Sequence, residues 1–167
     1  MAIEMKYCMA CGTKLTEKYL EGEGNVPFCP SCNDFRFPVF NTAVSMIVTN
    51  EDHSKIILIS STAGPSTSSW RAGYVNKGED AEDAAVREVW EEMGLHVTSL
   101  KFNHSHYFAP SNTLMLNFTA TVAGDEPTPN REIDSYDWFT PEEARVNIKD
   151  GSLAERFLKF YLDGGEF

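Results

Sequence analysis

The order of apolar and polar residues along the chain predicts a series of strands and helices that begins after residue 38. Residues 39–49 and 55–61 are rich in β-branched and other apolar side chains, and the polar residues 50–54 separate them. Apolar runs bounded by turn-forming residues are typical of β-strands. Further strands are expected at 72–79, which is short and enters a glycine-containing loop, and at 95–108, 113–123 and 133–140.

Three helices are expected. Residues 80–93 carry apolar side chains at helical spacing. A second helix is expected at 140–148, because Thr140, Pro141 and Glu143 stand where an N-cap residue, a first-turn proline and the third residue of a capping box would stand. Residues 153–165 have the pattern of a final helix that ends at glycine.

These elements place the chain in the α+β class, with a mixed sheet and helices packed against it. The segments 62–69 and 124–132 consist of small or turn-forming residues and are expected to be loops. Residues 1–38 contain many glycines and prolines and no long apolar run. We therefore expect a small N-terminal module at 1–38 and a main domain at 39–167.

Composition and charge narrow the function. The chain has 42% hydrophobic residues, which is enough to bury a core, and a net charge of −11. This charge argues against binding to duplex DNA or to an anionic membrane. No segment reaches the ~18 apolar residues of a membrane span, and the first residues lack the basic and apolar regions of a signal peptide. A cytoplasmic protein is the expectation.

All four cysteines lie in the N-terminal module, in the pattern Cys8-x2-Cys11-x17-Cys29-x2-Cys32. This spacing is typical of a structural zinc site, in which each CxxC turn supplies two thiolates to a tetrahedral Zn²⁺. Two disulfides or a redox CxxC are the alternatives, and the absence of a secretion signal disfavours the disulfides. The basic residues of the module alternate with acidic ones, so a scaffolding role is favoured over nucleic-acid binding.

The helix at 80–93 carries an unusual acidic patch. At about 100° per residue, Glu88, Glu91 and Glu92 fall within an arc of roughly 100°. No lysine or arginine follows Glu88 or Glu91 at the i+4 position, so the repulsion between the carboxylates has no compensating partner there. The residues expected on the opposite, core-facing side are Val86, Val89, Trp90 and Met93. A solvated acidic face is the ordinary explanation, but the repulsion favours a site for a divalent cation.

The stretch before this helix fits such a site. Gly73 and Gly78 allow the backbone to turn and to approach a ligand closely. Arg87 can pair with Glu79 and hold the loop against the helix. A magnesium ion held by carboxylates could also bind substrate phosphates and activate a water molecule.

Residues 73–95 as a whole resemble the Nudix box, G-x5-E-x7-R-E-U-x-E-E-x-G-U with U aliphatic, at every specified position. The resemblance implies a Nudix fold, an α/β/α sandwich with a mixed sheet, and Mg²⁺- or Mn²⁺-dependent hydrolysis of a nucleoside diphosphate linked to another moiety. It implies that Glu88, Glu91 and Glu92 bind the metal and that Arg87 and Glu79 form an orienting ion pair.

A cysteine ribbon directly before this domain is similar to the NADH pyrophosphatase group of the family. The segment REIDSYDWF resembles that group's E-I-x-x-A-x-W-F and places Glu132 as a further metal or catalytic residue. The group's SQPWPFP-x-S-L-M segment survives only in part, as Ser105, Phe108, Thr113 and Leu114–Met115. The large domain common before the ribbon in that group is not expected before this one. The group commonly forms homodimers, so a homodimer is also implied.

The resemblance implies an enzyme that cleaves NADH or NAD to NMNH or NMN and AMP. Gly73, Tyr74, Thr113 and Met115 are the candidate substrate contacts, and a core-facing Tyr74 remains the alternative for that residue. Trp70 and Trp138 are expected in the core, and His104 and His106 in a loop. ADP-ribose, a dinucleoside polyphosphate, a nucleotide sugar or NAD-capped RNA stay open as substrates. A non-catalytic module that binds a nucleotide or a protein is the remaining alternative.

Overall fold

The computed structural model describes residues 5–60, 72–124 and 126–165, and the chain divides into two compact units. The first unit comprises Met1–Asn41 with Phe108–Thr113, and the second comprises Thr42–Tyr107 with Leu114–Phe167. The expected loop at 62–69 and Trp70 lie outside the described residues.

The first unit contains a three-stranded antiparallel sheet of β1 (Thr16–Leu20), β2 (Gly24–Cys29) and β3 (Asp34–Phe35). The sequence indicated only turns here, because these strands are short and glycines and prolines lie in β2 and around the strands. Lys18 lies over the Phe28 ring at 4.2 Å, and Phe28 packs edge-on against Phe35. Within residues 5–41 the buried hydrophobic side chains are Cys8, Val26 and Cys29. So small a core cannot hold the sheet by apolar burial alone.

The second unit is built on a six-stranded sheet in the order β7-β8-β4-β5-β9, with β6 also paired to β4. The strands are β4 (Asn41–Thr49), β5 (Ile56–Ser60), β6 (Gly73–Tyr74), β7 (Val97–Phe108), β8 (Thr113–Val122) and β9 (Ser135–Phe139). The helices are α1 (Ala81–Met93), α2 (Pro141–Asn147) and α3 (Leu153–Leu162), and a 3-10 turn, η1 (Ala109–Ser111), joins β7 to β8.

Side-chain contacts give the strand directions. Asn117 Nδ2 donates to the Ser45 carbonyl, and Thr49 hydrogen-bonds Thr121. In each pair the two residues are 72 positions apart in the sequence. Residue numbers therefore rise together along β4 and β8, and the two strands run in the same direction. β4 pairs antiparallel with β5 and β6, and β5 pairs antiparallel with β9. The predicted mixed sheet is therefore confirmed.

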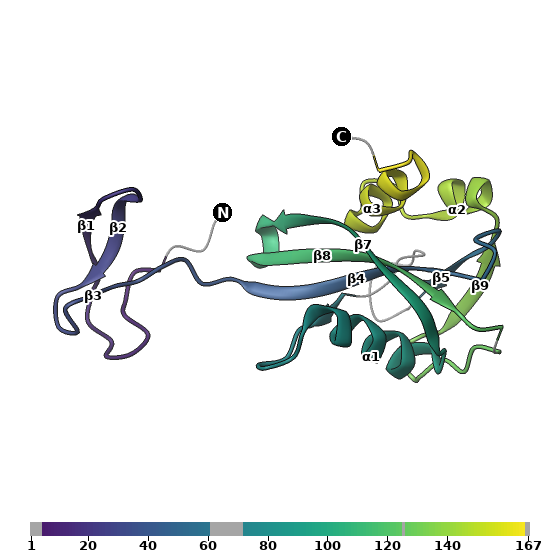
Figure 1. The fold of residues 1–167 in the computed structure, drawn as a ribbon, viewed down its shortest axis with the longest axis horizontal. Helices are drawn as coiled ribbons and strands as arrows, with labels where there is room; N and C mark the ends of the chain where they lie inside the picture. Colours follow the sequence, from purple (N-terminus) through teal and green to yellow (C-terminus); the bar gives the residue numbers. More distant parts are fainter. Residues whose placement is uncertain (1–4, 61–71, 125, 166–167) are drawn as a thin grey trace. The chain divides into compact units, whose positions relative to one another are not determined.

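Each face of the sheet has its own core. Even-numbered residues of β4 and β8, such as Val44 and Phe118, pack against Val89 and Met93 of α1. On the other face, Ile47 and Leu58 pack with Leu158 of α3 and with the side chains of α2. The strands lie between α1 and the pair α2 and α3 (Figure 1). This is the expected α/β/α arrangement.

The expected elements agree with the structure to within a few residues. The capping box at Thr140 is present, since the Thr140 hydroxyl accepts from Glu143 N and the Glu143 carboxylate accepts from Thr140 N. Trp138 is partly buried against the core, as expected. Within the described residues, each helix is too short or too polar to span a membrane.

Candidate functional site

The second half of α1 carries the predicted acidic patch, rotated partly toward the core. Glu92 is only 7% exposed, whereas Glu91 is exposed. Of the four residues expected on the core side, Val89 and Met93 are buried, but the prediction was wrong for Val86 (40% exposed) and Trp90 (51% exposed). Ala84 and Ala85 are buried on the same face of α1 as Val89 and Met93. With the helix in this orientation, Glu88 and Glu92 lie at the edge of the buried face. The Trp90 ring packs instead against His96, with 4.5 Å between the ring centroids.

Arg87 is the electrostatic centre of the patch. Its Nε and Nη2 donate to the two Glu79 carboxylate oxygens at 2.7 and 3.0 Å, so the pair expected from the sequence is present. Its Nη1 also donates to Glu88 at 2.6 Å and to Glu91 at 3.0 Å, and Nη2 donates to the Tyr74 carbonyl. The idea that repulsion among the glutamates is uncompensated therefore needs correction, because one guanidinium contacts three carboxylates. It still leaves a surplus of negative charge.

The Arg87–Glu79 pair makes stability depend on pH. Arg87, with a further hydrogen bond from Asn76 N, lowers the pKa of Glu79 from 4.5 to about 2. Because the folded value lies below the ordinary one, the stabilisation is complete above about pH 4.5 and is lost as the pH falls toward 2. We expect wild type to be more stable than Glu79→Gln at pH 7, with the difference shrinking below pH 4.5. Urea unfolding of both proteins across this range tests it, and a pH-independent difference would contradict the assignment.

Gly73 is the point where the sheet comes closest to the acidic patch. A Cβ built on Gly73 would lie 2.1 Å from both Cγ and Cδ of Glu88. The sequence indicated a close approach at this glycine, and the structure shows that the neighbour is the Glu88 side chain. Gly73 therefore allows Glu88 to lie against β6.

Replacing Gly73 by alanine should displace Glu88 from Arg87. We expect a loss of about 1–3 kcal/mol in the free energy of unfolding, from overpacking at a buried site. Gly124→Ala is the matched control, because a Cβ there meets nothing within 4 Å. Denaturant unfolding compares the two, and equal stabilities would show that the Glu88 contact imposes no constraint.

Two of the candidate substrate contacts, Tyr74 and Met115, lie on the other face of the second unit's sheet. Because Gly73 faces α1, its neighbour Tyr74 points the opposite way, where it is 58% exposed. This excludes the core-facing alternative for Tyr74. Met115 is buried and shares its face of β8 with Asn117, whose neighbours include Phe157 and Leu158 of α3. Thr113, at the start of β8, is buried and bonds Ser111.

The two histidines correct a second expectation. His104 and His106 lie within β7 and not in a loop. Phe102 contacts Phe118 on the α1 face, yet His104, two residues later, packs against Phe157 and Phe160 of α3. A regular strand would keep both side chains on one face, so β7 is irregular near Asn103. Burial, with Arg156 nearby, lowers the pKa of both histidines.

Glu132 approaches α1 through a loop. Its backbone N–H donates to Asn130 Oδ1, and Asn130 in turn bonds the end of α1. No role for Asn130 was expected, because a single asparagine in a loop has no distinctive signal.

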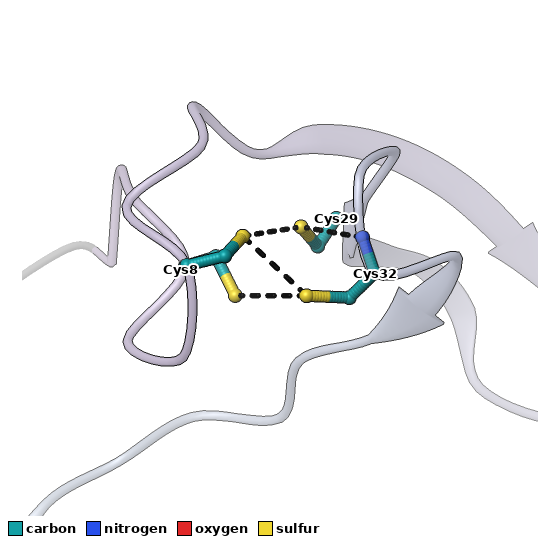
Figure 2. A group of neighbouring side chains, drawn as sticks. Cys8, Cys29 and Cys32 are labelled. Carbon is teal, nitrogen blue, oxygen red and sulfur yellow. Dashed lines mark hydrogen bonds between the residues drawn. The ribbon is translucent and has the colours of Figure 1, made fainter.

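The four cysteines converge in the first unit. Their sulfurs all lie within 4.8 Å of one another, with Sγ–Sγ distances of 3.4 Å for Cys11–Cys32 and 3.9 Å for Cys8–Cys32. All are free, which excludes the two disulfides considered from the sequence. Figure 2 shows the Cys8, Cys29 and Cys32 side chains turned toward one centre. Four sulfurs at this spacing could hold a metal ion.

The surroundings favour the thiolate form at two of these positions. Arg36 Nε donates to Cys8 Sγ at 3.2 Å and lowers the Cys8 pKa. Hydrogen bonds with Thr13 lower the Cys11 pKa to about 6. Cys32 shows the opposite shift, with its pKa raised to about 12, because its sulfur lies beside those of Cys11 and Cys29. Thiolates crowded in this way gain most from a bound cation.

The carboxylates of α1 are less closely gathered. Among the residues that the structure describes, the four cysteines are the one group of three or more His, Cys, Asp or Glu side chains whose ligand atoms all lie within 4.8 Å of one another. Glu88 and Glu91 are instead turned toward Arg87. The oxygen donors are of the type that magnesium prefers, and the Arg87 bonds use one oxygen of each carboxylate, Glu88 Oε1 and Glu91 Oε2.

Comparison with known proteins identifies relatives of this chain. The family model described as "NUDIX domain" matches residues 39–160. Among curated proteins, "NAD-capped RNA hydrolase NudC" of Pseudomonas aeruginosa is 30% identical over 94% of this chain and 55% of its own length. The protein of the same name from Deinococcus radiodurans is 32% identical over 81% of this chain and 49% of its own length. The chain thus spans about half the length of the curated relatives it matches.

Solved structures show the same fold. A NUDIX hydrolase from Nitrosomonas europaea superposes with a TM-score of 0.65 at 21% identity, over 95% of this chain and 91% of its own. An Ap4A hydrolase from C. elegans superposes with a TM-score of 0.58 at 19% identity, over 71% of this chain and 94% of its own.

Proposed function

We propose that this chain, which belongs to the NUDIX domain family of hydrolases, cleaves the pyrophosphate bond of a nucleoside diphosphate linked to another moiety, with NADH or NAD giving NMNH or NMN and AMP. The observation that carries the proposal is the arrangement around Arg87, which links Glu79, Glu88 and Glu91 in one ion-paired cluster. A structural helix has no need for so many carboxylates around a single cation.

Mg²⁺ or Mn²⁺ is the proposed cofactor of this cluster, with Glu88, Glu91, Glu92 and Glu132 as ligands. When bound, such an ion neutralises phosphate oxygens and lowers the pKa of a coordinated water. Arg87 and Glu79 would position Glu88 and Glu91. One of the glutamates would accept the proton of the attacking water, which then adds to a phosphorus atom as the pyrophosphate bridge breaks.

The substrate rings would bind on the opposite face of the sheet. Tyr74 is exposed beside Gly73 and can stack on a base or a nicotinamide ring. Thr113 and Met115 are the other proposed contacts. Aromatic stacking on Tyr74 fits a dinucleotide, since one ring can lie there while the pyrophosphate extends toward α1.

NAD-capped RNA is the second candidate substrate. Relatives from several bacteria carry the name NAD-capped RNA hydrolase. The bond to be broken is the same pyrophosphate as in free NAD, so the same carboxylates would serve. The net charge of −11 disfavours extensive contact with an RNA backbone and supports the small dinucleotide as the first choice.

Zn²⁺ is the proposed ion of the four-cysteine cluster, where it would act structurally. The burial of Cys8 and Cys29, and the small apolar core around them, support this assignment. The ribbon module would then comprise residues 1–38, and the hydrolase domain 39–167.

A panel of substrates tests the proposed function. The purified protein is incubated with Mg²⁺ or Mn²⁺ and with NADH, NAD⁺, ADP-ribose, dinucleoside polyphosphates, nucleotide sugars or NAD-capped RNA, and the products are identified by mass spectrometry. Release of AMP and NMNH at the highest kcat/KM supports the proposal. Faster turnover of another compound reassigns the substrate, and no turnover of any of them favours a binding module.

A further inference from the structure

The end of α1 is held by a distant loop. The last carbonyl groups of a helix have no N–H partner within the helix. Here Thr128 N donates to the Met93 carbonyl at 2.7 Å, and Asn130 N donates to the Glu92 carbonyl at 2.9 Å. The Asn130 side chain adds a third bond, from Nδ2 to the Glu91 carbonyl at 3.1 Å. Two of these three carbonyls belong to the glutamates of the acidic patch.

The loop lies close against the helix end. Gly94 has φ +64°, and a Cβ at this position would lie 2.0 Å from Thr128 Oγ1. The loop is also tied to the sheet, because Ile133 is buried in the α1-side core and the Tyr136 hydroxyl donates to the Pro127 carbonyl. These contacts hold Pro127 and Ile133 without the Asn130 side chain, so the protein should still fold when that side chain is replaced.

The Asn130 side chain also forms a hydrogen bond with the backbone of Glu132. Its Oδ1 accepts from Glu132 N at 2.9 Å, which is the local turn that asparagine side chains favour. One side chain therefore joins the backbone of Glu91 on α1 to the backbone of Glu132 on the loop. Since an amide offers a donor and an acceptor on the same planar group, the two bonds are set at a fixed separation.

We propose that Asn130 is a positioning residue, which sets the spacing between the α1 glutamates and Glu132 so that all can bind one divalent cation. This inference rests on the proposed function, which supplies the metal. Asn130 itself does not contact the ion. It acts by holding the backbone of Glu91 and Glu132, in the way that residues around a metal site orient the direct ligands.

Direct measurement of metal affinity tests this role. Mn²⁺ is titrated into the protein without substrate and free Mn²⁺ is followed by electron paramagnetic resonance. Asn130→Ala should raise the Kd for Mn²⁺ by about 10–100-fold, and its hydrolytic rate should recover at high Mn²⁺. The control is Pro129→Ala, at the exposed preceding position of the same loop. Proline has no N–H to donate, so this change removes no hydrogen bond and should leave both quantities unchanged.

A second variant separates the two bonds and guards against misfolding. Asn130→Asp keeps the oxygen that accepts from Glu132 N and loses the donor to Glu91, so its Kd should lie below that of Asn130→Ala. Wild-type Mn²⁺ affinity in a folded Asn130→Ala protein would overturn the inference. If wild type hydrolyses no substrate and binds no Mn²⁺, the proposed function fails instead, and the two failures are therefore distinguishable.

Discussion

Glu92→Gln should reduce kcat/KM for metal-dependent hydrolysis by about 10²–10⁴-fold while the protein stays folded. Glu92 is 7% exposed on the edge of α1 that meets the sheet, so its carboxylate is fixed by packing. Glutamine has nearly the same volume and keeps this packing, but it removes the negative charge that a cation needs. A folded but inactive protein would separate the charge of Glu92 from its structural role.

The matched control is Glu82→Gln, which removes an exposed carboxylate from the first turn of the same helix. Its turnover should equal that of wild type. Circular dichroism and thermal unfolding establish that both variants are folded, and initial rates are measured over a range of Mg²⁺ concentrations. Activity close to wild type in Glu92→Gln would remove Glu92 from the proposed metal site.

Cys29→Ser should abolish the zinc binding proposed for the first unit and unfold the ribbon. Cys29 is fully buried, and a serine hydroxyl does not replace a thiolate as a zinc ligand. Structural zinc binding contributes about 10–16 kcal/mol to the folding of small zinc peptides. The ribbon, with few buried apolar side chains, cannot compensate for such a loss. The second unit has its own two cores and should remain folded.

Metal content and proteolysis test this expectation. Atomic emission should find about one zinc per chain in wild type and almost none in the variant. Trypsin should then cleave the ribbon at its lysines and leave the second unit intact. Ser31→Ala, between Cys29 and Cys32, is the control and should keep its zinc. Full zinc occupancy in Cys29→Ser, or wild type without zinc, would contradict the four-cysteine assignment.

The sequence predicts most of the second unit well because β4, β5 and β8 are apolar runs and the helices carry start and stop signals. The capping box at Thr140 is a local interaction, so its residues alone define it. The strands of the ribbon escape prediction for the opposite reason. They are short, β2 contains Gly24 and Pro27, and few of their apolar side chains are buried.

The site is only partly predictable, because its details depend on tertiary contacts. The spacing of Glu88, Glu91 and Glu92 places them on one patch, but the rotation of α1 depends on Ala84 and Ala85 fitting against the sheet. Whether Arg87 contacts both Glu88 and Glu91 depends on the rotamer of its side chain, which the sequence does not determine. The bond of Asn130 to Glu91 crosses 39 residues, and no local pattern encodes it.

The two-residue strand β6 has a consequence for how such a chain can diversify. Gly73 faces the carboxylates of α1, and Tyr74 faces the opposite side of the sheet. Because the proposed ring-binding residue is Tyr74, a change of its side chain can alter the substrate contact without altering the fit between Gly73 and Glu88. In the proposed function, bond cleavage and substrate preference would then respond to different substitutions, although adjacent codons specify the two residues. Such a chain would be able to change its substrate through one surface of β6 while the other surface stays under constraint.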